Sequence, residues 1–234
     1  MAKLTVLQMT SDILNDMDSD PVDSITDTDE SLQVAQILKT TYFNIVSQRD
    51  WKFLRTLTTL TQTSSTTPTT MTIPATLNKV LWIKYNKKDV SYLEPKRFKD
   101  IIDQRDVDAD NVDANGYRTD KDPTWWTTYD DSSIVFDSYD IVVADKLVTA
   151  TSTVYGTSVP TWTDEDDDFT PNLPEKMFPI FLAAAKSTAF STLKQVSNAE
   201  AASYATRGII RAQNEHQRTK DAEEPSNRID YGRK

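Results

Sequence analysis

KLTVLQMTSDILNDMDSDPVDSI (residues 3–25) and SLQVAQILKTTYFNIVSQRDWKF (residues 31–53) stand near the start of this 234-residue chain and decide its fold. In the first stretch the apolar residues from Val6 to Met17 recur at three- and four-residue steps, which gathers them on one face of a helix. Pro21 follows as a stop, because proline lacks an amide donor and pushes its predecessor out of the α conformation. The stretch therefore predicts two helices joined by a tight corner.

The second helix is predicted to begin at Asp27, whose carboxylate can cap free backbone amides while Glu30, three residues on, reaches back. Its apolar face consists of Val34, Ala35, Leu38, Tyr42, Ile45 and Val46. The short connection makes the two helices antiparallel neighbours. Trp51 and Phe53 follow directly and are large and apolar enough to close the end of the pair.

Composition and charge restrict the class of protein. With 38% hydrophobic residues the chain can fill one large domain, or a core with an insertion. It has no Cys, which excludes a disulfide framework and a thiolate metal site. No apolar run approaches the roughly 18 to 20 residues of a membrane span, and the N-terminus lacks a signal-peptide pattern. We therefore expect a soluble protein without a membrane partner.

Charge divides the chain unevenly. The net charge is -10, which disfavours nonspecific adhesion to DNA phosphates. Residues 100–145 hold thirteen Asp against Arg105, Arg118 and Lys121, so this segment alone carries -10. Residues 186–220 instead have six basic side chains against Glu200 and Glu215. One part of the molecule is expected to repel polyanions, and another to accept an acidic partner.

Residues 54–163 are predicted to form a β-rich insertion. The Thr-rich stretch 54–62 has the β-branched pattern of a strand and is followed by turn residues at 64–70, which favours a hairpin over a disordered stalk. Further strands are predicted at 71–73, 79–85, 125–130, 133–136 and 147–155, with a short helix at 98–102. Within 79–85 strict alternation sets Val80, Trp82 and Lys84 against Leu81, Ile83 and Tyr85.

A second helical pair is predicted over residues 164–221. Asn172 and Glu175 resemble a capping box, and Pro174 lies in the first turn, where its missing donor costs little. Pro179 either kinks the first turns or marks the start of the regular helix. The apolar face of this helix consists of Met177, Phe178, Phe181, Leu182, Ala185, Ala189, Phe190 and Leu193.

Ser197 with Glu200 is expected to open a fourth helix. Its apolar side consists of Ala201, Ala202, Tyr204, Ala205, Ile209 and Ala212. Two helical hairpins separated by an inserted sheet predict an α+β fold: an antiparallel helical bundle of residues 1–53 and 164–221, the β-rich insertion 54–163 and an extended tail 222–234. The expected bundle core contains Ile13, Leu14, Leu38, Tyr42, Trp51, Phe53, Phe181 and Phe190.

The sequence offers little for catalysis. His216 is the only histidine and lies on a polar helical stretch, where a solvated surface residue is a better interpretation than a general base. Four Gly in the whole chain leave no room for a phosphate-binding loop, which excludes an ATPase of that type. We therefore expect neither an enzyme nor a cofactor.

Two acidic constellations leave alternatives open. Asn111 to Asp122 has the spacing of a calcium loop, but it has Asn at the first position and Asp at the twelfth, and Pro123 removes the exiting helix. A calcium-binding adhesion module is thus an alternative to an acidic surface turn. The acidic run 164–168 lies between Trp162 and Phe169, but adjacent acids in a flexible run do not supply the separation that a glycosidase needs.

The N-terminal block resembles the start of the head-to-tail adaptor proteins of short-tailed phages, the tail tubular protein A or head-completion family. Pro21-Val22-x-Ser24-Ile25 and Arg49-x-Trp51-x-Phe53 carry the resemblance at matching separations. The run Leu173-Pro174-Glu175 followed by Ala185-Lys186 and Phe190 resembles the third helix of that family. The resemblance covers both helical pairs and is weak in the insertion.

The resemblance implies a structural adaptor of the virion, assembled in the host cytoplasm and located at the head–tail interface. Its implied partners are the portal protein, a tail nozzle or tail tube protein, further copies of itself in a ring of twelve as in the family, and double-stranded DNA that passes through without specific binding. It also implies that the C-terminal region docks on the portal. At the level of the region, this places portal contacts at Arg207, Arg211, Arg218, Arg228, Ile229, Tyr231 and Arg233.

Two further expectations follow. Composition alone favours a frayed terminus for residues 222–234, whereas a portal-docking role implies a segment that folds on binding. The acidic segment 100–145 is expected in part to face the ring's lumen, because an acidic wall repels DNA and lets it slide. The alternative function is a peptidoglycan-cleaving glycosidase that uses acidic residues of the insertion.

Overall fold

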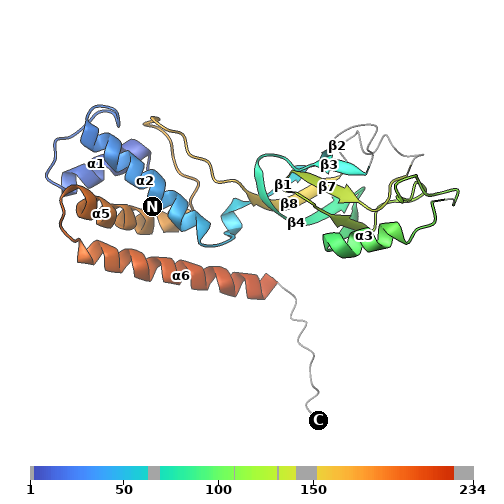
Figure 1. The fold of residues 1–234 in the computed structure, drawn as a ribbon. Helices are drawn as coiled ribbons and strands as arrows, with labels where there is room; N and C mark the ends of the chain where they lie inside the picture. The colour runs from blue at the N-terminus through green and yellow to red at the C-terminus, as the bar shows by residue number, and fades with distance from the viewer. Residues whose placement is uncertain (1–2, 63–68, 108, 131, 141–151, 224–234) are drawn as a thin grey trace, which may run out of the picture. The chain divides into compact units, whose positions relative to one another are not determined.

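The computed structural model describes residues 3–62, 69–107, 109–130, 132–140 and 152–223 (Figure 1). The chain divides into two compact units. The helical unit consists of residues 1–53 and 160–234, and the sheet unit of residues 54–159. The chain thus leaves the helical unit after Phe53 and returns to it at Pro160, whereas the sequence places the return at residue 164.

The helical unit is a succession of packed helix pairs. Helix α1 (Val6–Asp16) packs against α2 (Asp29–Ser47), and α2 packs against α5 (Phe178–Leu193). The one-turn 3-10 helix η3 (Glu175–Met177) leads into α5, and α6 (Ala199–Glu223) runs along α5. A second 3-10 turn, η1 (Lys52–Leu54), lies where the chain passes from one unit to the other.

These helices do not form the antiparallel bundle that the sequence predicts. Helix α6 has its extensive contacts with α5 alone, and among its described side chains only Ala205 is buried. Tyr204 and Ile210 are 54% and 52% exposed. Small residues let α6 approach α5 but offer too little apolar surface to reach a further helix. The fold is α+β, but the prediction of a bundle is wrong.

The helix starts are set by capping side chains, and in two cases not by the residues expected. Thr28 and Ser31 form the capping box of α2, whereas the Asp27 carboxylate accepts hydrogen bonds from the backbone N–H groups of Asp23 and Ser24, each at 2.8 Å. At α6 the side chain of Asn198, not Ser197, accepts from Ala201 N–H. Short polar side chains next to a helix start compete for the same backbone amides. The predicted cap of each of these two helices therefore lies one residue from the observed cap.

The starts of α1 and α5 follow from the residues of their first turns. Thr5 and Gln8 form a reciprocal capping box at the start of α1. Pro179 lies in the first turn of α5, where its missing N–H leaves no hydrogen bond unmade. Of the two interpretations of Pro179, the start of the regular helix is therefore the one confirmed.

The core of the helical unit contains most of the residues assigned to the bundle core. Ile13, Leu14, Leu38, Tyr42, Trp51 and Phe181 are buried, and Phe53 and Phe190 are half-buried. The Tyr42 ring contacts Trp162 and Phe181 at centroid distances of 5.5 and 6.5 Å. Trp51 donates its indole N–H to the Ile45 carbonyl at 3.0 Å and stacks on Phe53, so it closes the C-terminal end of α2.

Within the described residues the sheet unit has eight strands in the order β1-β8-β4-β5-β6-β7-β3-β2. Their bounds are β1 Arg55–Thr59, β2 Thr61–Gln62, β3 Thr70–Thr72, β4 Leu77–Tyr85, β5 Lys88–Tyr92, β6 Trp125–Thr127, β7 Ser133–Phe136 and β8 Thr153–Ser158. The pairing of β5 with β6 is parallel, and all other pairings are antiparallel. Only Leu60 separates β1 from β2, which end the order on opposite sides, so the sheet curls back on itself.

The inner face of this sheet holds a compact apolar core. Its buried members are Leu60, Met71, Leu77, Ile83, Tyr85, Val90, Trp126, Ile134, Phe136 and Val154. Helix α3 (Pro95–Asp103) adds a second cluster in which Phe98 and Ile102 pack with Leu93 and Val135. Burial of these side chains, at about 25 cal/mol per Å² of apolar area, is the main stabilising contribution to the unit.

The sequence pattern did not predict two local features of the sheet. Asn86 and Lys87 both have positive φ, +46° and +68°, and join β4 to β5, a strand that was not predicted, as a tight hairpin. Bulges at Asn78 and Leu81 interrupt the pairing of β4 with β8. Val80 therefore packs on the core while Trp82 is exposed, and the predicted strict alternation of these two residues on one face is wrong.

The remaining predicted elements are placed as follows. Strand β6 ends at Thr127 rather than 130, and α3 begins at Pro95 rather than 98. Most of the predicted strand 147–155 and of the turn 64–70 lies outside the described residues, as do residues 224–234 of the tail. Residues 222 and 223 belong to α6. Among helices in the described ranges, none has the length and apolar character needed to cross a lipid bilayer.

Candidate functional site

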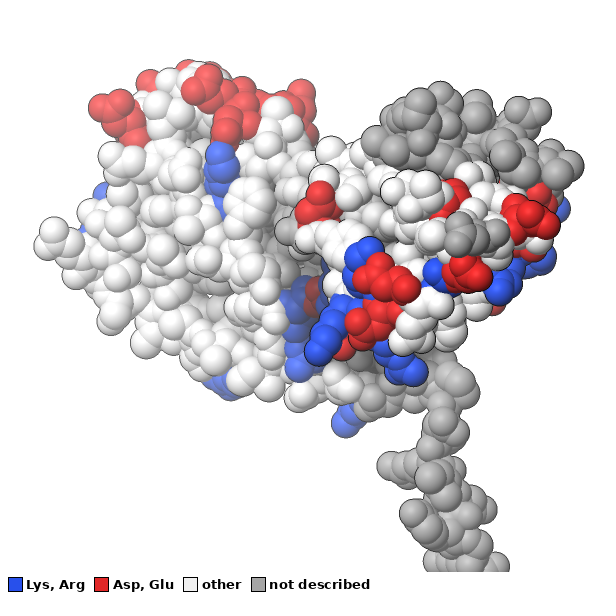
Figure 2. All heavy atoms as spheres, turned by 45° about the vertical axis from the view of Figure 1, so that its right-hand side comes forward, with Lys and Arg blue, Asp and Glu red and all other residues white. Residues whose placement is uncertain are grey.

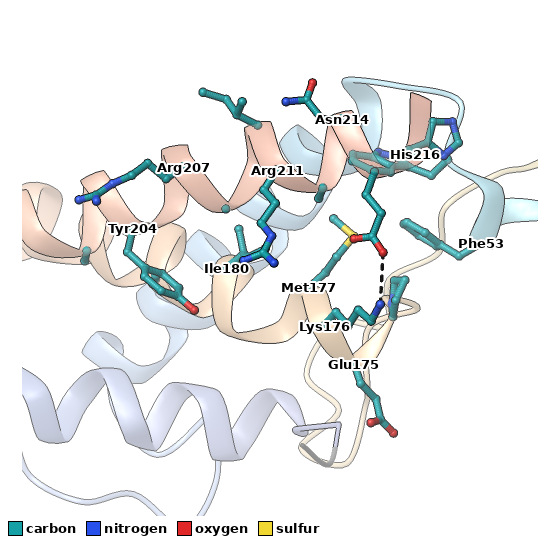
Figure 3. Close-up of a pocket in the computed structure, with 18 of the residues that line it drawn as sticks. Phe53, Glu175, Lys176, Met177, Ile180, Tyr204, Arg207, Arg211, Asn214 and His216 are labelled. Carbon is teal, nitrogen blue, oxygen red and sulfur yellow. Dashed lines mark hydrogen bonds and ion pairs between the residues drawn. The ribbon is translucent and has the colours of Figure 1, made fainter. Parts of the chain in front are cut away.

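An open groove with a volume of about 1980 Å³ lies in the helical unit, along α5 and α6 (Figure 3). Met177, Ile180 and Ala183 contribute apolar surface from the η3 and α5 side, and α6 forms the facing wall. Trp51 and Phe53 line it together with His216 from the C-terminal half of α6.

Gly208 sets the distance between the two helices. A Cβ atom at this position would lie 2.6 Å from Cγ1 of Ile180, inside the contact distance of two carbon atoms. The missing side chain lets the backbone of α6 approach α5, which places the exposed face of α6 at the edge of the groove. Glycine in a helix interior costs about 1 kcal/mol relative to alanine, so the close packing has to offset that cost.

One stripe of α6 lines the groove with polar and cationic side chains. Tyr204, Arg207, Arg211 and Arg218 follow at steps of three, four and seven residues, which places them on the same side of the helix. All four are exposed. Figure 3 shows Tyr204 and Arg211 directed from α6 toward the α5 side, with Arg211 near Ile180 and Met177.

The arginines of this stripe have few acidic partners. Arg207 donates to Ser203 one turn earlier, and Arg211 and Arg218 form no hydrogen bond or ion pair with any described residue. Across the groove Lys176 pairs with Glu215 at 3.2 Å, an exposed pair that contributes little to stability. The guanidinium groups are therefore available to carboxylates of another molecule, which they bind as planar two-pronged donors.

The α5 side is anchored to α1 by a charge cluster. Lys186 lies 2.8 Å from Asp12 and 2.6 Å from Asp16, and its side chain is 18% exposed. Burial by itself lowers the pKa of Lys186, but the hydrogen bonds to Asp12 and Asp16 outweigh it and raise the pKa above its ordinary value. Lys186 therefore stays charged, and its two ion pairs hold α5, which contributes apolar surface to the groove, against α1.

The end of the groove near Trp51 ties the N-terminal and C-terminal segments together. Arg49 donates to the Gln213 carbonyl at 3.1 Å, and the Gln213 side chain donates to Gln48 at 2.8 Å. His216 is half-buried, with its ring 5.7 Å from that of Trp51 in an edge contact. His216 is therefore less exposed than a fully solvated surface histidine, because α6 extends back over Trp51 and Phe53.

The sequence-predicted contact residues fall into two groups. Arg207, Arg211 and Arg218 are brought together along the groove, and Arg228, Ile229, Tyr231 and Arg233 lie outside the described residues. Lys176 and Tyr204 were not assigned to the site. The spacing of Tyr204 from Arg207 and Arg211 could have placed it on the same face, but the sequence analysis gave it to the apolar side.

The calcium-like loop is closed by hydrogen bonds of its own. Asp113 Oδ1 accepts from the N–H groups of Asn115 and Tyr117, each at 2.9 Å, and Gly116 has φ +85°. At the twelfth position Asp122 pairs with Lys88 at 2.6 Å. Across the described ranges no three acidic or histidine side chains converge in a way that could hold a metal ion. Of the two interpretations of this segment, a calcium-binding loop and an acidic surface turn, the hydrogen bonds within it correspond to the surface turn.

The acidic run 164–168 is part of the framework of the helical unit. Asp164 pairs with Lys39 of α2 at 2.7 Å, and Asp167 Oδ1 accepts from Ile25 N–H at 2.8 Å. The run and the residue after it also accept backbone hydrogen bonds from the first turn of α1: Leu7 N–H donates to the Asp167 carbonyl, and Val6 N–H donates to the Phe169 carbonyl. The interpretation of residues 164–168 as a solvated loop therefore describes only part of the run. Nothing in the sequence indicated these pairings.

The acidic segment of the sheet unit contains a buried ion pair between Arg105 and Asp137. Arg105 Nη2 lies 2.8 Å from Asp137 Oδ2, with the two side chains 13% and 2% exposed. Asp137 Oδ1 accepts from the N–H groups of Thr124 and Trp125, each at 2.8 Å. Asp137 is thus a structural residue. Figure 2 shows acidic and basic side chains intermixed on the visible face toward the right of the view, consistent with the Lys88–Asp122 and Lys99–Asp103 pairs.

Comparison with known proteins gives no family. No family model matches the chain, and no curated protein matches it either. The arrangement of the groove is therefore interpreted from its own chemistry: an apolar floor, an aromatic end and a stripe of arginines along an exposed helix. Such a surface is suited to bind a protein segment that presents carboxylates beside apolar side chains.

Proposed function

We propose that this protein is a structural head-to-tail adaptor of a phage virion, which forms a ring between portal and tail and continues the channel for DNA. The observation that carries the proposal is the arginine stripe of α6 along the groove. It provides the surface on which the acidic face of a portal ring would dock. The resemblance of residues 21–25 and 49–53 to the adaptor family supports the same function.

The chemistry of the stripe suits a permanent protein contact. Arg207, Arg211 and Arg218 can each donate two parallel hydrogen bonds to a carboxylate. Tyr204 and the apolar floor add surface that becomes buried in a complex, and Arg and Tyr are the residue types that dominate binding energy in interfaces. Charge complementarity of this kind also fixes the register in which two rings meet.

The acidic segment 100–145 of the sheet unit supports passage of DNA. Its exposed carboxylates include Asp100, Asp103, Asp110, Asp120 and Asp130. A surface of this sign repels phosphates, so DNA that moves past it is not retained. In the assembled ring we place part of this surface on the lumen or its rim, next to a tail nozzle or tail tube protein. Assembly in the host cytoplasm and a final position at the head–tail interface follow from this role.

The test is binding to purified portal rings of the virus that encodes the chain. We expect the protein to cosediment with the rings, and electron microscopy of the complex to show a second ring of densities beneath the portal. Arg207→Glu with Arg211→Glu should weaken binding by at least about tenfold, because like charges then face the portal carboxylates.

The matched control is Arg97→Glu, an equal change on exposed helix α3 of the sheet unit. It should bind portal rings like the wild type. Circular dichroism of every variant checks that the helices are intact. The adaptor proposal fails if the wild type does not bind portal rings at any concentration. It also fails if the variant with both groove substitutions binds them as well as Arg97→Glu does.

A further inference from the structure

A second cavity, with a volume of about 370 Å³, opens in the sheet unit. Its apolar wall is formed by Ile73, Leu77, Val80 and Trp126, which belong to the core of that unit or pack against it. Small-molecule sites have volumes of about 300 to 1,000 Å³, and the mouths of β-barrels are among the places where they occur. We call this space the sheet cavity.

The sheet cavity lies where strand β4 departs from regular pairing. Strand β5 pairs only with residues 83–85 of β4, and the cavity is lined by residues 77–81, which precede them. Asn78 and Leu81, the two bulged residues of β4, both belong to this lining. Bulges redirect side chains and are over-represented next to functional sites. The irregular part of β4 is thus the part that forms the cavity wall.

One polar group of this wall has no partner. Trp126 is 5% exposed, and its indole N–H forms no hydrogen bond with any described residue. A buried indole N–H usually has an acceptor, because an unpaired buried donor costs free energy. Since Trp126 lines the sheet cavity, a ligand oxygen bound there would supply the missing acceptor.

The sheet cavity also has a carboxylate that is fixed in position. Asp130 is exposed, and its Oδ1 accepts from the N–H groups of Ser132 and Ser133 at 3.0 and 2.7 Å, while both serine hydroxyls donate to the same carboxylate. The hydrogen bonds from Ser133 and then those from Ser132 lower the pKa of Asp130 to about 2. The group is therefore charged at neutral pH, and Oδ2, which accepts from Ser132 alone, can accept from a ligand hydroxyl.

Tyr92 and Asn78 complete the lining that the ligand would contact. Tyr92 is 54% exposed and meets Trp126 edge to face, with the ring centroids 4.9 Å apart and an interplanar angle of 65°. More than half of the Tyr92 side chain is thus open to a ligand. Asn78 is also exposed, and its amide can both donate and accept.

The charges of the lining restrict the class of ligand. Asp130 disfavours an anion, and Lys79, which lines the same cavity, disfavours a cation. A neutral ligand therefore fits best, with an oxygen for Trp126, a hydroxyl for Asp130 and an apolar face for Tyr92. We propose that the sheet cavity binds a unit of a neutral saccharide, whose hydroxyl groups donate and accept and whose C–H groups form an apolar face.

The sheet cavity is suited to binding a saccharide and not to cleaving it. Among the described residues that line it, Asp130 is the single carboxylate. Glycoside hydrolysis ordinarily uses two carboxyl groups, about 5 to 10 Å apart. Saccharide binding is thus a second function of the chain, and it does not depend on binding to the portal.

The first experiment applies the full chain to an array of neutral and acidic oligosaccharides. We expect binding to at least one neutral glycan. That glycan is then added to ¹⁵N-labelled protein, in which the variant Trp126→Phe identifies the indole N–H signal of Trp126 by its loss. Of the five Trp of the chain, Trp126 should show the largest shift of this signal.

Tyr92→Ala and Asp130→Asn should each weaken binding of that glycan by at least about tenfold. Asparagine keeps an oxygen that accepts from the two serine N–H groups but loses the charge. The matched control is Tyr129→Ala, because Tyr129 is 55% exposed in the same unit and does not line the cavity. It should bind the glycan like the wild type. Circular dichroism of each variant checks that the sheet is intact.

Saccharide binding in the sheet cavity is refuted if the array shows no neutral glycan bound, or if Tyr92→Ala and Asp130→Asn bind as the wild type does. It is also refuted if Tyr129→Ala loses as much binding as Tyr92→Ala, or if a lysine-rich peptide and no glycan shifts the Trp126 signal. Binding to portal rings is measured in parallel. A chain that binds a glycan in this cavity but no portal rings refutes the adaptor function and leaves the saccharide site standing.

Discussion

The carboxylate of Asp167 accepts a hydrogen bond from the backbone N–H of Ile25 at 2.8 Å, across 142 residues of sequence. The residue lies in an acidic run that composition assigns to a solvated loop, but it closes the turn between α1 and α2. Together with the Lys39–Asp164 pair, it joins the segment that returns from the sheet unit to the N-terminal helix pair. The two halves of the helical unit are thus held by polar contacts as well as by the apolar core.

Asp167→Ala should lower the free energy of unfolding by about 1 kcal/mol, because Ile25 N–H loses its acceptor in a half-buried site. Asp168→Ala is the control, since it removes the same charge from a neighbouring exposed residue. Urea unfolding followed by circular dichroism measures both. Equal unfolding midpoints for the two variants would show that the Asp167–Ile25 bond contributes nothing specific.

Gly208→Ala should destabilise the helical unit by about 1 kcal/mol, since overpacking costs about 1 to 3 kcal/mol and alanine recovers only about 1 kcal/mol of helix propensity. The added Cβ would lie 2.6 Å from Ile180. Combining it with Ile180→Ala should show a favourable coupling energy in a double-mutant cycle. Asn214→Ala, at an exposed position of α6, is the comparison. A stabilised Gly208→Ala variant contradicts the close packing.

Arg105→Met should destabilise the sheet unit by about 3 kcal/mol, because Asp137 is then a buried carboxylate without its ion-pair partner. Arg105→Met with Asp137→Asn should recover part of the loss, since the amide oxygen still accepts from Thr124 and Trp125 and no buried charge remains. Urea unfolding of both variants and of Asp137→Asn alone completes the cycle. Additive losses would show that the two side chains do not interact.

The pH dependence at alkaline pH should depend on Tyr85. Burial first, and then the charges of Asp122 and Asp140, raise the pKa of Tyr85 from 10.0 to about 12. The unfolded chain releases this proton near pH 10 and the folded chain near pH 12, so the stability that Tyr85 contributes is complete below pH 10. It is lost as pH rises toward 12, by roughly 2 kcal/mol.

The measurement compares unfolding of the wild type with Tyr85→Phe from pH 9 to pH 12. The difference between the two should be constant at the lower end and should shift in favour of Tyr85→Phe as pH rises. Other tyrosines, including Tyr42 and Tyr117, also have raised pKa values, so the variant keeps a smaller slope of its own. A wild type and variant with parallel curves would mean that Tyr85 ionises as in the unfolded chain.

The positions of the helices in the helical unit could largely be predicted because their signals are local, whereas their packing, which is not the predicted bundle, could not. The helices at residues 6–16 and 29–47 follow from apolar residues at three- and four-residue steps, and burial of Ile13, Leu38 and Tyr42 follows from the same periodicity. The caps were off by one residue at α2 and α6, because neighbouring polar side chains compete for the same amides. In the sheet, the apolar pattern could not reveal the bulge at Leu81. One inserted residue reverses the face of the sheet on which every following side chain lies.

Sequence by itself determined where the helices and most of the described strands of this protein lie, because backbone preference and apolar periodicity act over a few residues. Only the tertiary structure decided that α6 packs mainly on α5, that Gly208 permits their close approach, and that Arg207, Arg211 and Arg218 share one groove. It also decided that Asp167 binds Ile25 and that Asp137 is buried with Arg105. Such contacts join residues far apart in the chain, and the free energy that selects them comes from burial and charge pairing that no local pattern records.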